Sequence, residues 1–253
     1  MLSTVDTAAI LLLAGVAAGL IGSAGGITSL VSFPALLAVG LPAHAANVAN
    51  NVALVGCWPG SALASQPELH GRAPWLKRWT AVAAAGAAAG AVLLVSTPSD
   101  VFARVVPFLV AAGSLALLLE PRLRAWHHRS AGGARDVALP AGVVVLSMYN
   151  GYFGAGSGVM TLTLMLVLID RRLPAANALK NMLIGAGSLG AATVLVLCGS
   201  VEWSAALPLA VGMLAGSRIG PVAARRLPAN LLRPAIAVLG LSLAVDLWLY
   251  PSA

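Results

Sequence analysis

The sequence predicts an all-α polytopic membrane protein made of two inverted repeats, each a glycine-broken hairpin of short helices followed by three transmembrane helices. Of the 253 residues, 59% are hydrophobic and only 9% are charged, whereas a water-soluble domain carries about 25% charged residues. In lipid the backbone must satisfy its own hydrogen bonds, which leaves helices or closed barrels. Continuous apolar runs at 81–96 and 105–119 lack the alternation of barrel strands and therefore favour helices.

The second half of the chain repeats the first. Three glycines recur at one offset, so that Gly19, Gly22 and Gly26 correspond to Gly151, Gly154 and Gly158. Further blocks follow in the same order: Leu41–Ala43 with Leu173–Ala175, Gly71–Trp75 with Gly199–Trp203, Gly86 and Gly90 with Gly212 and Gly216, and Arg104 with Arg233. Internal repeats of this kind are typical of secondary transporters. We therefore divide the chain into a first repeat at 1–119, a basic cytoplasmic linker at 120–137 and a second repeat at 138–253.

Each repeat contains five apolar segments. They lie at about 7–21, 26–39, 43–65, 77–96 and 102–119, and then at about 138–153, 158–169, 175–198, 204–221 and 230–250. The first two of each repeat have roughly 14 residues, or about 21 Å of helix, which is shorter than a full span of about 20 residues. Glycine clusters at 22–26 and 154–158 separate them. Because glycine weakens helices, each short pair is predicted to turn near the middle of the membrane.

The basic residues predict the orientation of the chain. The formal net charge is +7, but the arginines and lysines lie in short loops between apolar runs, as topology requires, and we expect no nucleic-acid partner. With the linker inside the cell, Arg104 is the only basic residue left in an outer segment. Three spans follow each hairpin, and this odd number inverts the second repeat. The protein is thus expected in the cytoplasmic membrane with both termini outside.

The glycine clusters are the strongest candidates for a binding site. A broken helix exposes backbone N–H groups at the start of its second part, and these groups and the helix dipole attract an anion. The predicted substrate-binding residues of the clusters are Gly22, Ser23, Gly25, Gly26, Gly154, Gly156, Ser157 and Gly158. The alternative is that small residues only allow helices to pack closely. The sequence leaves both roles open.

Polar side chains follow each hairpin and extend the predicted site. They are Asn47, Asn50 and Asn51 in the first repeat, and Lys180 and Asn181 in the second. A lysine within a span is costly and marks a functional site by default, so Lys180 is a candidate to neutralise an anion. Snorkelling of its ammonium to the cytoplasmic headgroups is the alternative.

Other kinds of chemistry have no signature in this chain. No nucleophile–base set, phosphate loop or metal-ligand spacing is present, and the glycine clusters lack the βαβ unit of a dinucleotide site. We therefore predict that the protein is not an enzyme and uses no cofactor or metal.

The motifs resemble a known family. Gly19–Gly26, Pro34 and Gly40–Ala45 resemble the opening of the sulfite exporter TauE/SafE family. Gly151–Gly158 followed by Ala176–Asn181 resembles its second repeat, and Gly199–Trp203 and Gly212–Gly220 also match. The resemblance implies transport of sulfite, sulfonates or other sulfur-containing anions across the cytoplasmic membrane.

These observations together predict a secondary transporter that moves a small anion by alternating access. Two alternatives remain from the sequence: an anion channel whose pore is lined by the same hairpin tips, and a membrane scaffold that transports nothing. The expected partners are the small anion and the lipid bilayer, and a homodimer is left open.

Overall fold

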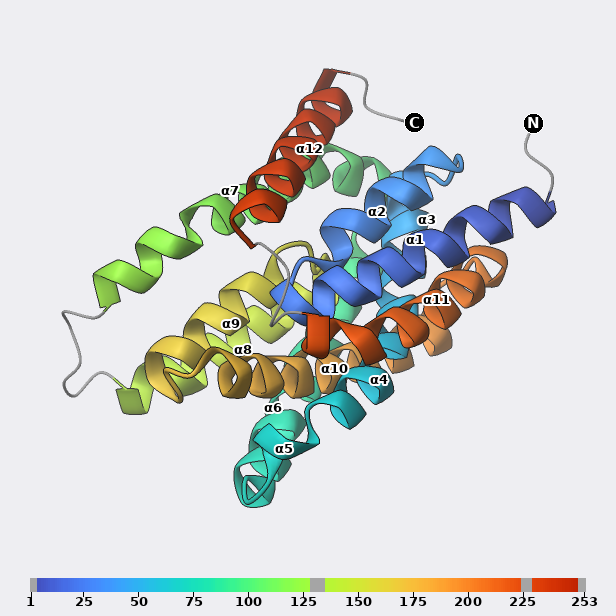
Figure 1. Ribbon diagram of the computed structural model, residues 1–253. Coiled ribbons are helices and arrows are strands. Elements are labelled where there is room, and N and C mark those ends of the chain that lie inside the picture. Colours follow the sequence, from blue (N-terminus) through green and yellow to red (C-terminus); the bar gives the residue numbers. More distant parts are fainter. Residues whose placement is uncertain (1–3, 128–134, 224–228, 250–253) are drawn as a thin grey trace.

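The computed structural model describes residues 4–127, 135–223 and 229–249. The first half contains α1 (Thr4–Gly25), α2 (Thr28–Ala38), α3 (Ala43–Ala53), the 3₁₀ turn η1 (Leu54–Gly56), α4 (Cys57–Ala64), α5 (Gln66–Leu69), α6 (Ala73–Ser96) and α7 (Ser99–His127). The second half contains α8 (Arg135–Tyr152), α9 (Ser157–Leu168), α10 (Leu173–Cys198), α11 (Trp203–Ala223) and α12 (Ala229–Leu249). No strand occurs in the described ranges (Figure 1), so the all-α prediction is confirmed.

Length and composition make this chain a multi-pass membrane protein. Among the described residues, five helices are long and apolar enough to cross a bilayer: α1, α6, the 99–119 part of α7, α10 and the Trp203–Val222 part of α11. Large apolar side chains also cover the outer surface, for example Phe108, Leu197 and Trp248, which are 64%, 77% and 67% exposed. Such a surface is unfavourable in water, but the acyl chains of a bilayer solvate it.

Two helices differ from their predicted form. α1 has 22 residues and is long enough to span, whereas the sequence predicted a short segment at 7–21. Gly22 and Gly25 remain helical because a glycine costs only about 1 kcal/mol within a helix, and the chain first leaves the helix at Gly26, where φ is +81°. The predicted span at 43–65 is also divided, since η1 separates α3 from α4.

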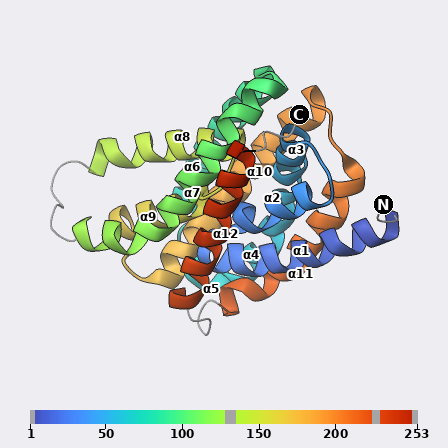
Figure 2. The same ribbon diagram turned by 90° about the horizontal axis from the view of Figure 1, so that it is seen from above.

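The closest neighbours of α1 and α8 are helices of the other half. α1 packs along α11, and α6 packs along α8; both views show α1 and α11 side by side (Figures 1 and 2). A Cβ on Gly19 would lie 2.5 Å from the carbonyl oxygen of Met213, and one on Gly151 would lie 1.9 Å from that of Ala87. Only glycine permits such an approach of two backbones.

These two contacts are equivalent under the sequence repeat. Gly19 corresponds to Gly151, and the offset that relates Gly212 to Gly86 also relates Met213 to Ala87. These paired contacts agree with a twofold relation between the halves, which stays a prediction. The opposite orientation of the halves across a membrane stays a prediction, as does the basic cytoplasmic linker: α7 and α8 extend into 120–137, and residues 128–134 lie outside the described ranges.

Candidate functional site

The two helix breaks touch each other inside the bundle. Gly26 (φ +81°) separates α1 from α2, while Gly154 (φ +83°) and Gly156 (φ +78°) separate α8 from α9. These are left-handed conformations that favour glycine. A Cβ on Gly158 would lie 2.4 Å from the carbonyl oxygen of Gly26, and one on Gly26 would lie 2.5 Å from the carbonyl carbon of Gly158. The structure thus brings the two predicted glycine clusters into backbone contact.

The carboxyl end of α1 is capped by side chains of α10. Ser23 O accepts hydrogen bonds from Nδ2 of Asn177 at 2.9 Å and from Nδ2 of Asn181 at 3.2 Å. Lys180 Nζ donates to Gly22 O at 3.1 Å and lies 3.5 Å from Ser23 O. A cation at this position is stabilised by the negative end of the helix dipole. Because Lys180 is only 1% exposed, its ammonium does not snorkel to the headgroups in this structure.

The three asparagines of α3 have different environments. Asn47 Nδ2 donates to Tyr152 O at 2.8 Å and so caps the carboxyl end of α8. Asn50 donates to Ser29 Oγ at 3.1 Å and accepts from Ser32 Oγ at 2.5 Å, which ties α3 to α2. Asn51 is fully buried, and neither amide atom of its side chain has a hydrogen-bond partner. Two of the predicted residues therefore position helices rather than face a ligand.

The amino ends of α2 and α9 lie beside the two touching breaks, but no side chain caps them. Neither Ile27, the N-cap residue of α2, nor Gly156, the N-cap residue of α9, makes a side-chain capping hydrogen bond. The first N–H groups of a helix have no partner within it. At each break, side chains of the opposite half satisfy the carbonyl end, whereas no side chain caps the positive end. The N–H of Ser157, the first residue of α9, donates to Gly154 O at 3.1 Å, and the other first N–H groups of the two helices can donate to a ligand.

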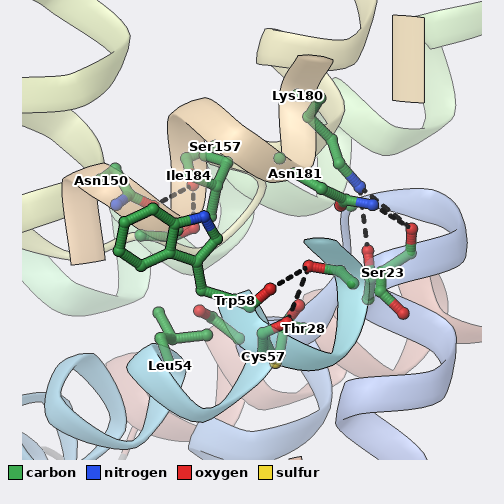
Figure 3. A pocket seen from close by; sticks show the side chains of 17 residues that line it. Ser23, Thr28, Leu54, Cys57, Trp58, Asn150, Ser157, Lys180, Asn181 and Ile184 are labelled. Carbon is green, nitrogen blue, oxygen red and sulfur yellow. Dashed lines mark hydrogen bonds between the residues drawn. The ribbon is translucent and has the colours of Figure 1, made fainter. Parts of the chain in front are cut away.

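A buried pocket of about 30 Å³ lies between these helix ends (Figure 3). That volume accommodates the centres of one or two water molecules. The predicted residues that line it are Gly22, Ser23, Gly26, Gly154, Ser157, Gly158, Lys180 and Asn181. The predicted residues outside its lining are Gly25, Asn47, Asn50, Asn51 and Gly156. Gly156 instead faces α7, where a Cβ would lie 2.6 Å from Gly113 Cα.

Comparison with known proteins identifies the family. The family model described as sulfite exporter TauE/SafE matches residues 8–247, which is nearly the whole chain. The chain belongs to the sulfite exporter TauE/SafE family. The resemblance in the sequence motifs is thereby confirmed, and the protein is a membrane transporter of the TauE/SafE type.

Several curated relatives resemble this TauE/SafE protein along their length. A "Probable membrane transporter protein" of Haemophilus influenzae is 27% identical and covers 93% of this chain and 92% of its own. "Probable membrane transporter protein ORF9" of a Sinorhizobium species is 28% identical, with 96% and 93% covered. "Probable membrane transporter protein YfcA" of Escherichia coli K12 is also 28% identical, with 93% and 87% covered. No solved structure matches this chain.

Sequence reasoning missed several pocket residues of this TauE/SafE protein, among them Trp58 and Asn150. Trp58 lines the pocket and packs on Gly185, where an added Cβ would lie 2.2 Å from Cδ1 of the indole. Asn150 accepts from Ser157 Oγ at 2.8 Å, and its buried Nδ2 has no partner. The available signal was an amide within an apolar segment, four residues before the second glycine cluster at 154–158.

An ion-pair cluster lies in the loops and away from this pocket. Asp170, in the loop between α9 and α10, pairs with Arg72 and with Arg172, whose Nη2 is 3.0 Å from Asp170 Oδ2. Hydrogen bonds from Arg172, with a further one from Arg72, lower the pKa of Asp170 to about 2. The cluster joins the start of α6 to the start of α10 and so holds the loops that precede two spans.

Proposed function

We propose that this protein is a secondary transporter that moves a small anion, either sulfite, a sulfonate or another sulfur-containing anion, across the cytoplasmic membrane by alternating access. The observation that carries the proposal is the buried ammonium of Lys180, which lines a pocket without a carboxylate among its described lining residues. The uncapped amino ends of α2 and α9 border the same pocket. An anion placed there would receive donors from three directions.

Electrostatics supports an anionic ligand. The carboxyl end of a helix carries about half a negative charge, so α1 compensates the ammonium of Lys180 only in part. A buried charge without full compensation is costly, and a bound anion would supply the missing negative charge. Sulfite and sulfonate groups present several oxygens that accept hydrogen bonds from N–H groups and hydroxyls. Ser29, at the first turn of α2, offers such a hydroxyl, since its Oγ accepts a hydrogen bond from Asn50.

The position of the pocket suits a carrier. It lies between helix ends, and the helices around it would have to separate to load and release the substrate. The pairs α1–α11 and α6–α8 each join helices of both halves, so one pair with the helices packed on it would rock against the other pair. A scaffold without transport would need the glycine contacts, but it would not need a buried ammonium beside uncapped helix ends.

Substrate class and orientation follow from the family and from the charges. The name of the matching family model specifies sulfite export, and the names of the relatives specify a membrane transporter without a substrate. The basic loops would face the cytoplasm, with both termini outside.

A counterflow assay in proteoliposomes tests the proposal. Vesicles with the purified protein are loaded with unlabelled sulfite, and the entry of labelled sulfite is measured over a concentration series; taurine and sulfoacetate are tested in parallel. A carrier shows saturable entry that internal substrate accelerates. Linear entry without acceleration identifies the channel alternative, and entry equal to that of protein-free vesicles for every anion supports the scaffold.

A further inference from the structure

Three buried residues beside the anion pocket carry polar atoms without a hydrogen-bond partner among the described residues. They are Asn51 of α3, Asn150 of α8 and Ser188 of α10, and each is at most 2% exposed. The atoms without a partner are both amide atoms of Asn51, Nδ2 of Asn150 and Oγ of Ser188. A buried polar atom without a partner is costly and calls for an explanation. We call these three residues the polar layer.

Ser188 differs from other hydroxyl residues within the helices. The hydroxyls of Thr163 and Thr193 each donate to the carbonyl oxygen four residues earlier. Ser188 lies well inside α10, yet its Oγ makes no such bond and is available to another partner. Asn181 and Ile184, which line the pocket, precede Ser188 by seven and four residues, so the three share one face of α10. Ser188 therefore extends the pocket along this helix by one turn.

The polar layer also extends the pocket along one face of α3. Asn47 and Asn51 are four residues apart and share this face, and Leu54, three residues after Asn51, lines the pocket. A Cβ on Gly154, itself a pocket residue, would lie 3.6 Å from Asn51 Oδ1. Oδ1 of Asn47 is a further buried atom without a partner in the described part of the chain. This face thus carries unsatisfied polar atoms for two turns beyond the pocket.

Asn150 connects the pocket with α10. Its Oδ1 accepts from Ser157 Oγ, while its Nδ2 would lie 3.3 Å from a Cβ on Gly187. Figure 3 shows Leu54 and Asn150 on the opposite side of the pocket from Lys180. Both α3 and α8 pack against α10. The polar layer therefore lies between these three helices, on the side of the pocket remote from the ammonium.

The contacts of α6 define the direction in which the polar layer lies. Asp170, just before α10, pairs with Arg72, just before α6, so these two helices begin at the same face of the bundle. Nε2 of His44, at the start of α3, lies 3.4 Å from Leu94 O, near the end of α6. Because α6 is long enough to span a bilayer, α3 starts at the opposite face. With the orientation predicted from the basic residues, the polar layer lies between the pocket and the outer face.

We propose that the transported anion moves between the pocket and the outer face through the polar layer, where the amides of Asn51 and Asn150 and the hydroxyl of Ser188 bind it. This route rests on the proposed function. Polar side chains inside a helical membrane bundle mark substrate pathways. The layer is sealed in this structure, and its atoms gain partners when the helices separate around an anion. Neutral donors suit a passage because they bind an anion less tightly than charged groups do, so that it can leave again.

Cysteine accessibility in intact cells tests this route. Asn51→Cys and Ser188→Cys are made separately in a background that carries Cys57→Ala and Cys198→Ala. The cells are treated with sulfonatoethyl methanethiosulfonate, an anionic thiol reagent that does not cross lipid, and in parallel with its cationic trimethylammonium counterpart. Each rate is divided by the rate of the same reagent with a free thiol in solution. Both cysteines should react from outside, and faster with the anionic reagent.

Two matched controls lie on the same helices. Ala49→Cys on α3 and Ala186→Cys on α10 change buried residues two positions from Asn51 and Ser188, and therefore on the opposite helix faces. Both controls should stay unreacted with either reagent. Ser188→Cys replaces only Oγ by Sγ and is expected to fold, so it carries the test if Asn51→Cys does not fold.

Each outcome decides the proposal. Reaction of both test cysteines no faster than that of their controls overturns the route, and this is the result if sealed water molecules satisfy the polar layer. Reaction that appears only after the cells are permeabilised also overturns it, because the opening would then be at the inner face. Equal normalised rates with the two reagents overturn anion binding there. Counterflow without labelling would remove this route and leave the proposed function, whereas labelling without counterflow would remove the function and leave the opening.

Discussion

Replacement of Lys180 by methionine separates charge from helix capping. Methionine is similar in shape to the lysine stem but has no ammonium. Ser23 O keeps its hydrogen bonds from Asn177 and Asn181, and Gly22 O keeps that from the backbone N–H of Gly26 at 2.6 Å. The end of α1 therefore stays satisfied in the variant, and we expect it to fold.

The loss in anion binding can be estimated from the same geometry. A unit charge about 4 Å from an anion contributes about 4 kcal/mol at an effective dielectric constant of 20, and desolvation of the anion offsets part of this. A charge-assisted hydrogen bond has a net value of about 1.5–3 kcal/mol. Lys180→Met should therefore raise the KM for the transported anion roughly 10- to 150-fold.

The assay is the initial rate of sulfite entry into proteoliposomes, measured against sulfite concentration at equal amounts of folded protein. Lys77→Met is the matched control, because Lys77 is the chain's other lysine and is exposed at the start of α6. We expect its KM to equal that of the wild type. If Lys180→Met folds and its KM stays within about twofold of the Lys77→Met value, the ammonium does not contact the anion.

Two further predictions concern stability. Gly158→Ala should destabilise the fold by about 1–3 kcal/mol, because its Cβ would lie 2.4 Å from Gly26 O. The control Gly25→Ala, whose Cβ would have no atom nearer than 4.0 Å, should leave Tm unchanged. Equal melting temperatures of the two variants would contradict the contact between the breaks. Asp170→Asn should cost about 1–2 kcal/mol at pH 7. The folded pKa of Asp170 is lowered from 3.8 to about 2. Its contribution to stability is therefore complete above about pH 4 and is lost as pH falls through 2. The difference in unfolding free energy between the wild type and Asp170→Asn, measured by chemical unfolding, should be smaller at about pH 3 than at about pH 7.

Much of the architecture could be predicted from the sequence because it depends on local properties. Long apolar runs specify membrane helices wherever they pack, and glycine at Gly26, Gly154 and Gly156 specifies breaks because the left-handed backbone is accessible to it. The predicted length of α1 was too short for a related reason. Hydropathy marks where apolar residues begin, but a helix continues through glycine until backbone geometry ends it.

The lining of the pocket could be predicted only in part, because identical residue types acquire different environments from their neighbours. Asn50 and Asn51 are adjacent in sequence, yet Asn50 is tied to Ser29 and Ser32, whereas the amide of Asn51 has no partner. Nothing in the local pattern distinguishes them. The face of α3 that each occupies, and the helix that packs on that face, decide the difference.

The sequence by itself determined that this chain is a helical membrane protein with two glycine-broken segments, since hydropathy and backbone freedom belong to single residues and short runs. Only the tertiary structure decided which helix ends are capped by side chains of the other half and which have no side-chain cap. The partners of Lys180 and Asn177 are carbonyls more than 150 positions away in the chain. Such contacts depend on how whole helices fit together, and no local pattern encodes them.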